Sequence, residues 1–310
     1  MDHFAYDPVR PGHLALEEGV FLESRFSLIG ALLALLPKRS LTRAAGRLLE
    51  HEVSRLLIPW YIRRYSLDLT DAILPPGEYR SLFELFTRRL RPGARPVDPG
   101  GKTVVSPVDG VVGGMGVIHD GTFIQAKGHA YPVADLLGGH FPDELEEGTW
   151  ITLYLSPADY HRIHLPLRGK PLQAAHIPGT FFPVNRLGTR GVRRLFARNE
   201  RWVTTFSTAA GTMYLVEIGS FIVGSVRLTY LPEEIQQISD RKILQKWEVS
   251  HIPTIGKGEE IGYFSFGSTV VLLFERGRVE WKSHLKTGDP VRMGQSLGLI
   301  RELRYEGARV

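Results

Sequence analysis

A proline- and glycine-rich segment, Arg91–Gly101, divides the sequence into two parts whose residue patterns differ. Before this segment, apolar residues recur at intervals of three and four, which is typical of helices that bury one face. After it, short apolar runs alternate with glycine-rich turns, which is typical of antiparallel strands. We therefore expect an α+β protein. N-terminal amphipathic helices, within residues 1–98, should precede a mainly antiparallel β-barrel or β-sandwich domain, residues 99–310.

The N-terminal part contains three candidate helices. Its longest apolar run, Phe26–Leu36, has eleven residues, whereas a helix needs roughly 20 to cross a bilayer. A second helix is expected to begin near Ser40 or Thr42 and to be kinked at Pro59. A third, shorter helix is expected within Tyr79–Leu90. No signal peptide is expected, because no basic segment precedes the first apolar run.

Basic residues gather on the second helix. The stretch from Lys38 to Arg64 holds seven Lys and Arg residues and two Glu residues, and the whole chain has a net charge of +5. With its apolar positions and the pair Trp60-Tyr61, this helix has the features of one that lies on an anionic membrane surface. The alternative is a helical hairpin that packs on its own domain. Nucleic acid is not expected as a partner, because the bases are not interleaved with aromatic residues along strands.

Cysteine is absent from the 310 residues, which excludes disulfides, thiolate metal sites and a cysteine nucleophile. Hydrophobic residues make up 43% of the chain and charged residues 23%. This composition favours a globular protein with a sizeable core over a disordered chain.

Gly267-Ser268-Thr269 leads directly into the apolar run Val270–Phe274. A turn that enters a buried strand holds a hydroxyl at a fixed place, which suits a catalytic serine. The alternative is a turn in which the glycine supplies conformational freedom and the hydroxyls cap the backbone. The sequence around Ser268 is also not the Gly-x-Ser-x-Gly elbow of hydrolases.

Three further residues are candidates for chemistry. Asp109 lies in a Pro-Val-Asp-Gly turn between two expected strands, where an aspartate commonly bonds its own backbone. His161 and His164 are three residues apart, so one helical turn would bring both imidazoles to the same side. No metal site is predicted, because a third ligand is not evident and no H-E-x-x-H pattern occurs. With Ser268, an acid and a histidine supply the parts of a proton relay.

Six segments occur in a characteristic order. They are Ser106–Gly110; Gln125–Gly128 with Tyr131 and Leu136–Gly139; Tyr160–His164; Pro178–Asn185; Leu195–Arg201; and Lys257–Gly262 leading to Gly267-Ser268-Thr269. In this order the chain, from about Leu41 to Ile300, resembles the phosphatidylserine decarboxylase proenzymes, which are pyruvoyl-dependent lyases. Two positions depart from the family pattern: Phe266 replaces the usual Leu, and Gly219-Ser220 replaces Gly-Ala. Neither touches the reacting atoms.

The resemblance implies a self-cleaving enzyme. Ser268 would attack the carbonyl of Gly267, with His164 as the base and Asp109 as its orienting partner. The chain would split into a β chain, 1–267, and an α chain, 268–310. Ser268 would become a covalent pyruvoyl cofactor that forms a Schiff base with the amine of phosphatidylserine. His161 is the expected proton donor after CO₂ leaves, and phosphatidylethanolamine is the expected product.

A lipid substrate also strengthens the membrane interpretation of residues 26–65. The resemblance implies a peripheral protein on the cytoplasmic face of the cell membrane. Its expected partners are phosphatidylserine, an anionic membrane surface, the α and β chains of the same precursor, and a second copy in a homodimer.

Three alternatives compete with this interpretation. Gly288–Gly298 and Ser106–Val112 together resemble the two halves of a biotinyl or lipoyl carrier domain, but no lysine at a hairpin tip is evident, and the segments are far apart for so small a domain. A serine hydrolase would use Ser268 repeatedly on external esters. A pyruvoyl decarboxylase could also act on a soluble amino acid.

Overall fold

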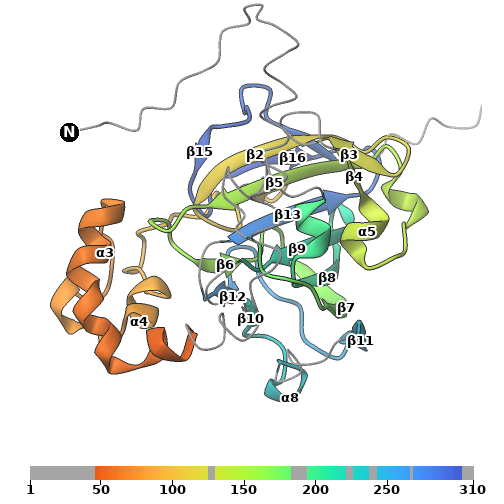
Figure 1. Ribbon diagram of the computed structural model, residues 1–310. Coiled ribbons are helices and arrows are strands. Elements are labelled where there is room, and N and C mark those ends of the chain that lie inside the picture. Colours follow the sequence, from red (N-terminus) through yellow and green to blue (C-terminus); the bar gives the residue numbers. More distant parts are fainter. Residues whose placement is uncertain are drawn as a thin grey trace, which may run out of the picture.

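The computed structural model describes residues 46–124, 130–182, 194–220, 226–236, 243–265 and 268–301. Figure 1 shows short helices at one side of a body of β-sheets. The N-terminal elements are the 3₁₀ helices η1 (Glu52–Leu57) and η2 (Pro76–Glu78) and the α-helices α3 (Ile58–Tyr65) and α4 (Leu82–Phe86). The predicted apolar helix Phe26–Leu36 lies outside the described residues.

The described part of the second predicted helix is interrupted at His51, not kinked at Pro59. The His51 side chain accepts a hydrogen bond from the backbone N–H of Val53 and so caps η1. Pro59 lies in the first turn of α3, where its missing N–H costs no helical hydrogen bond. The third predicted helix is shorter than expected, because the Ser81 hydroxyl caps α4 immediately before Leu82.

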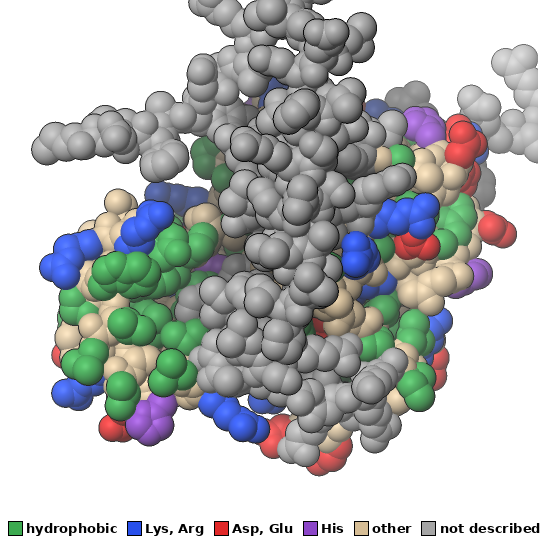
Figure 2. All heavy atoms as spheres, in the orientation of Figure 1, with side chains coloured by type: hydrophobic (Ala, Val, Ile, Leu, Met, Phe, Trp, Pro, Cys, Tyr) green, Lys and Arg blue, Asp and Glu red, His purple; other side chains and the backbone are tan. Residues whose placement is uncertain are grey.

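These helices enclose a small hydrophobic core of their own. Its buried members are Leu49, Ile58, Tyr61, Leu67, Tyr79, Leu82, Leu85 and Phe86. Outside this core, the helical residues 46–50, η1 and α3 leave large apolar side chains in solvent, with Leu56 75% exposed and Trp60 54% exposed. We call Leu48, Val53, Leu56, Leu57 and Trp60 the apolar helix surface. Figure 2 shows hydrophobic side chains beside Lys and Arg on the helical part.

The β part is built on one sheet of eight strands in the order β11-β7-β8-β9-β13-β5-β2-β15. Every neighbouring pair is antiparallel. In chain order the strands are β2 (Gly110–Val117), β5 (Thr149–Leu155), β7 (Gly169–Ile177), β8 (Arg201–Thr208), β9 (Gly211–Ile218), β11 (Gln245–Glu248), β13 (Ser268–Phe274) and β15 (Pro290–Val291). All seven residues of β13 are buried, as its β-branched and aromatic residues favour.

Different elements cover the two faces of this sheet. The sheet-covered face lies under two three-stranded sheets, β1 (Thr103–Val105), β16 (Ser296–Ile300) and β14 (Val279–Trp281), and β10 (Val226–Leu228), β12 (Glu260–Phe264) and β6 (Arg162–His164). The helix-covered face packs on the hairpin β3 (Thr122–Ile124) and β4 (Ala130–Pro132), on α5 (Val133–Leu137) and on α7 (Leu195–Arg198). Two short helices, η3 (Asp143–Leu145) and α8 (Glu233–Gln236), complete the described elements. The side chains of β13 alternate between the two cores.

The fold class is α+β with mainly antiparallel sheets, as predicted. The eight-stranded sheet ends at β11 and β15, which do not pair with each other in the described residues, so the sheet is open. Its layers make the β part sandwich-like, and the barrel alternative is not supported. The described helices include none with both the length and the hydropathy to cross a membrane.

The loop between β5 and β6 connects the β part to the helices. The Tyr61 hydroxyl donates to the carbonyl of Pro157 at 2.7 Å. The Arg88 guanidinium donates to the carbonyls of Ala158 and Asp159 at 2.8 and 3.1 Å. The helical part therefore contacts the loop that leads directly into β6.

Candidate active site

Ser268 is the first residue of β13, so the strand begins two residues earlier than the predicted apolar run. The strand pairs with β5 on one side and β9 on the other. Because side chains alternate along a strand, Ser268 points to the sheet-covered face, as Val270 does. The Ser268 side chain is 0% exposed, and its hydroxyl has no hydrogen-bond partner. A buried hydroxyl without a partner is destabilising, and such groups concentrate at reactive sites.

Asp109 lies in the turn between β1 and β2, as predicted. Its carboxylate accepts hydrogen bonds from Arg95 Nε at 2.9 Å and Arg95 Nη2 at 2.6 Å, and from the backbone N–H of Met293 at 2.8 Å. Gly110 is required next to it, because a Cβ there would overlap the carbonyl oxygen of Tyr154. The turn is therefore held tightly against β5, and the acid is paired with an arginine.

The two histidines do not share a helix. Residues 162–164 form β6, so His161 lies immediately before a strand and His164 ends it. The expectation that one helical turn would align the two imidazoles is therefore wrong. Residues an odd number apart on extended backbone point to opposite sides, and the two side chains have different surroundings.

His164 is bonded at both ring nitrogens. Nδ1 lies 2.9 Å from the carbonyl oxygen of Gly258, so Nδ1 carries the proton, and Nε2 accepts from the Tyr160 hydroxyl at 3.0 Å. Its backbone N–H donates to the carbonyl of Pro107 at 2.8 Å, which ties β6 to the turn that holds Asp109. Burial lowers the pKa of His164, so the ring is neutral at neutral pH.

His161 is completely buried against the helical part. Its ring centroid lies 3.8 Å from that of Phe86 in α4. Nδ1 donates to the carbonyl of Asp159 at 2.8 Å, and Nε2 has no partner. Burial lowers the pKa of His161 to about 3, so Nε2 carries an unprotonated, unused lone pair at neutral pH.

The register of the central strands brings these residues to one end of the sheet. Tyr154 of β5 pairs with Val111 of β2 on one side and with Thr269 of β13 on the other. The turn that holds Asp109 and the hydroxyl of Ser268 therefore flank β5, with backbones about 10 Å apart across two strand spacings. From this end of β5 the chain enters the loop that carries His161 and leads into β6, which ends at His164.

The described residues hold the components of the relay without connecting them. No hydrogen bond in this part of the chain links Asp109, His164 and Ser268, because the first two have other partners and the third has none. Gly267, the other predicted cleavage residue, lies outside the described residues. The described residues contain no group of three or more His, Asp and Glu that could hold a metal ion.

Sequence reasoning missed Arg95 and Tyr160. Arg95 belongs to the connector between the two parts, yet its Nη1 also donates to Asp71 at 2.8 Å, so it joins the helical part to the Asp109 turn. The one feature of the sequence that could have indicated Arg95 is its position as a basic residue inside a Pro- and Gly-rich segment. Tyr160 directly precedes His161, and its hydroxyl became relevant only once the strand geometry was known.

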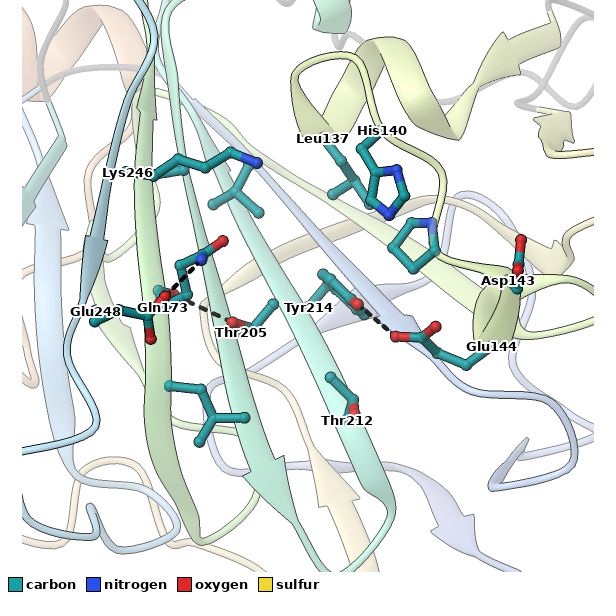
Figure 3. A pocket seen from close by; sticks show the side chains of 14 residues that line it. Leu137, His140, Asp143, Glu144, Gln173, Thr205, Thr212, Tyr214, Lys246 and Glu248 are labelled. Carbon is teal, nitrogen blue, oxygen red and sulfur yellow. Dashed lines mark hydrogen bonds between the residues drawn. The ribbon is translucent and has the colours of Figure 1, made fainter.

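A cavity of about 540 Å³ opens on the helix-covered face, away from Ser268. Figure 3 shows its polar side chains, including the pair Tyr214 and Glu144, whose hydrogen bond is 2.8 Å long. Gln173 and Glu248 form a second pair at 2.9 Å. None of the four predicted catalytic residues lines this cavity.

Comparisons with known proteins agree with the resemblance. A family model described as phosphatidylserine decarboxylase matches residues 82–299. A relative from Brevibacillus brevis, called phosphatidylserine decarboxylase proenzyme, is 44% identical over 273 residues, covering 87% of this chain and 97% of that protein. Relatives with the same name from Hahella chejuensis and Azotobacter vinelandii are each 40% identical, covering 86% and 89% of this chain and 91% and 99% of their own.

Proposed function

The chain belongs to the phosphatidylserine decarboxylase family and decarboxylates phosphatidylserine, and we propose that its electrophile is a pyruvoyl group made from Ser268. The observation that carries the proposal is the Ser268 hydroxyl, which is buried at the head of a central strand without a partner. A pyruvoyl carbonyl at this position supplies an acceptor for the substrate amine and for the electrons released as CO₂ leaves.

Self-cleavage produces this group from the chain itself. Ser268 Oγ attacks the carbonyl carbon of Gly267, and the hydroxyl proton passes to His164, so that an ester replaces the peptide bond. Elimination breaks the ester Cβ–O bond and leaves Gly267 with a free carboxylate. Water then displaces ammonia from the resulting dehydroalanine. The products are a β chain, 1–267, and an α chain, 268–310, that begins with the pyruvoyl group.

His164 suits the role of base. The hydrogen bond from Nδ1 to Gly258 fixes the tautomer, which leaves the lone pair on Nε2, and burial keeps the ring neutral. The Tyr160 hydroxyl occupies that lone pair and has to turn aside during the reaction. Asp109 orients His164 through the turn whose Pro107 carbonyl accepts the His164 backbone N–H.

His161 moves a proton in the decarboxylation itself. The amine of phosphatidylserine is an ammonium at neutral pH and has to lose a proton before it can react. Nε2 of His161 is buried, unprotonated and unpartnered, so its lone pair is available, and the negative charge of the bound substrate raises its basicity so that it can accept that proton. The imidazolium then returns the proton to the carbon that has lost CO₂. The proton donor in this scheme is therefore an acceptor first.

The apolar helix surface is the proposed contact with the membrane. Five large apolar side chains are exposed there, and Arg47, Arg55, Arg63 and Arg64 are exposed on the same elements. Apolar insertion combined with attraction to anionic headgroups is the physical basis of interfacial binding. We assign residues 1–98 to a membrane-associating region of a peripheral protein on the cytoplasmic face, and residues 99–310 to the catalytic domain. A homodimer is a further proposed state.

The proposal is tested by the mass of freshly purified protein and its turnover of phosphatidylserine. Two chains split at Gly267-Ser268, an α chain carrying an amine-reactive carbonyl, and release of CO₂ are expected. One intact chain with an unmodified Ser268 would contradict the proposal.

A separate assay tests the membrane contact. Leu56→Ser combined with Trp60→Ser should lower binding to vesicles containing phosphatidylglycerol by about tenfold, because it removes buried apolar area. Ile243→Ser is the matched control, since Ile243 is an exposed apolar side chain of the β part. Equal binding by the double variant and the control would assign the surface to another contact.

A further inference from the structure

Arg88 is buried in an unusual state at the junction of the two parts. Arg88 lies two residues after the end of α4 and is 5% exposed. Nη2 donates to two backbone carbonyls, whereas Nε and Nη1 are buried and have no partner. No carboxylate of the described residues forms a salt bridge with it, so the buried guanidinium lacks direct charge compensation. Burial of an unpaired charge is costly, which points to an anion that completes the site.

Tyr79 supplies another unused donor beside this guanidinium. Tyr79 is 4% exposed, and its hydroxyl is buried without a partner. Burial raises the pKa of Tyr79 and the nearby Arg88 charge lowers it, so the two groups interact electrostatically. A tyrosine hydroxyl and two guanidinium N–H groups together form a set of donors that suits an anionic oxygen ligand.

This set of donors adjoins the proposed proton carrier. The carbonyl oxygen of Asp159 accepts from Arg88 Nη2 at 3.1 Å and from His161 Nδ1 at 2.8 Å, so the two side chains are bonded to one atom. Phe86, two residues before Arg88, contacts the His161 ring, with the two ring planes tilted by 43°. The unpartnered atoms of Arg88 and of His161 therefore belong to one buried junction.

We propose that Arg88 and Tyr79 bind the phosphodiester of the lipid head group, an inference that rests on the proposed function. The substrate has two anionic groups, a carboxylate and a phosphodiester. A cation that paired with the carboxylate would stabilise the substrate more than the transition state, in which that charge leaves as CO₂, and would slow the reaction. A cation on the phosphodiester holds a charge that does not change. Arg88 also belongs to the helical part, on which the lipid chains are proposed to lie.

The test compares ligands with and without the carboxylate. Dihexanoyl phosphatidylethanolamine, the product with its phosphodiester and no carboxylate, is titrated by calorimetry into matured wild-type, Arg88→Gln and Tyr79→Phe protein. Arg88→Gln should weaken binding about tenfold or more, since a hydrogen bond to a charged group is lost. KM for dihexanoyl phosphatidylserine should rise by a similar factor. Tyr79→Phe should weaken binding several-fold without loss of stability, because its hydroxyl has no partner in the free protein.

Each alternative has its own outcome. Unchanged binding of the phosphatidylethanolamine with a raised KM for the phosphatidylserine would overturn the proposal in favour of a carboxylate contact. Unchanged values for both ligands would leave Arg88 as a clamp on the loop after β5. Arg89→Gln is the matched control, because Arg89 is exposed and carries the same charge one residue away. If Arg88→Gln fails to self-cleave, Tyr79→Phe decides. If the wild-type protein binds the product but forms no pyruvoyl group, the proposed function is contradicted and the phosphodiester site is not.

Discussion

The sheet-covered face and the cavity on the helix-covered face differ in how their polar side chains are hydrogen-bonded. On the sheet-covered face, Ser268 and Glu217 are completely buried and their side-chain oxygens have no hydrogen-bond partner. On the helix-covered face, two pairs of side chains that line the cavity are hydrogen-bonded, Tyr214 with Glu144 and Gln173 with Glu248. The cavity thus contains paired polar groups, whereas the closed face holds groups that cost free energy to bury. The proposed catalytic serine is one of those unsatisfied buried groups and does not line the cavity.

Ser268→Ala should have the largest effect, because it removes the atom that is proposed to initiate cleavage. The variant should remain one chain and show no decarboxylation. An intact-mass spectrum and a denaturing gel measure the first outcome, and CO₂ release measures the second. Cleavage of this variant at the same bond would show that the unpartnered Ser268 hydroxyl is not the reacting group, and the buried face would then lose its proposed link to the chemistry.

His164→Ala and Asp109→Asn should slow self-cleavage about 100-fold or more, because general-base catalysis commonly contributes that much. The rate is read from the time course of the two chains after synthesis. His119→Ala is the control, since His119 is exposed on the β part away from the turn. A cleavage rate near that of the control would exclude the altered residue from the relay.

His161→Ala should mature normally but decarboxylate about 100-fold more slowly, because only the later proton transfer needs it. Because burial lowers the pKa of His161 to about 3 in the free protein, wild-type kcat/KM should show no decrease from this residue as the pH falls through 6.5. The measurement is kcat/KM from pH 5 to 8 on cleaved enzyme. Wild-type turnover by the variant would rule out the proton-transfer role.

Glu217→Gln tests how much stability the protein loses by burying the Glu217 carboxyl on the sheet-covered face. Burial raises the pKa of Glu217 well above its usual range, so the folded state binds the proton that the unfolded state releases above about pH 4.5. Stability should then fall with rising pH, by about 1.4 kcal/mol per pH unit, until the folded-state pKa is reached.

Glu217→Gln should remove the fall of stability with pH. The free energy of unfolding is measured with urea between pH 5 and 8, in protein that also carries Ser268→Ala so that it stays one chain. An unchanged slope would mean that Glu217 is not the group responsible.

Tyr214→Phe and Glu144→Gln should have the smallest effect. Both side chains line the cavity and bond to each other, far from the proposed chemistry. Cleavage and turnover should stay within about twofold of wild type, since the cavity that they line includes none of the four predicted catalytic residues. A large loss of activity in either variant would show that the helix-covered face takes part in function.

Much of the β part was predictable because its signals are local. The strands at Thr149–Leu155, Gly211–Ile218 and Ser268–Phe274 follow their apolar patterns, and the turn at Asp109 follows its Pro-x-Asp-Gly sequence. The two segments that resemble the halves of a carrier domain lie side by side in the fold, since β15 pairs with β2. The open sheet was not predictable, because closure depends on which edge strands meet.

The partners of the site residues were beyond the sequence because they are distant in it. A spacing of three between the two histidines fits one helical turn, and only pairing with β12 makes Arg162–His164 a strand. The ion pair of Asp109 with Arg95 depends on a fold in which the connector turns back to the sheet. The roles of the four site residues stay predictions that the variants above test.

The position of Ser268 at the head of β13 has a consequence for the matured molecule. The strand that the proposed cut would release is hydrogen-bonded along both edges, to β5 and to β9, and the residues after it supply β14, β15 and β16 to other ladders. The fragment 268–310 therefore contributes strands to two sheets and cannot dissociate unless those sheets unfold. Maturation would change the number of termini while leaving a single cooperative body.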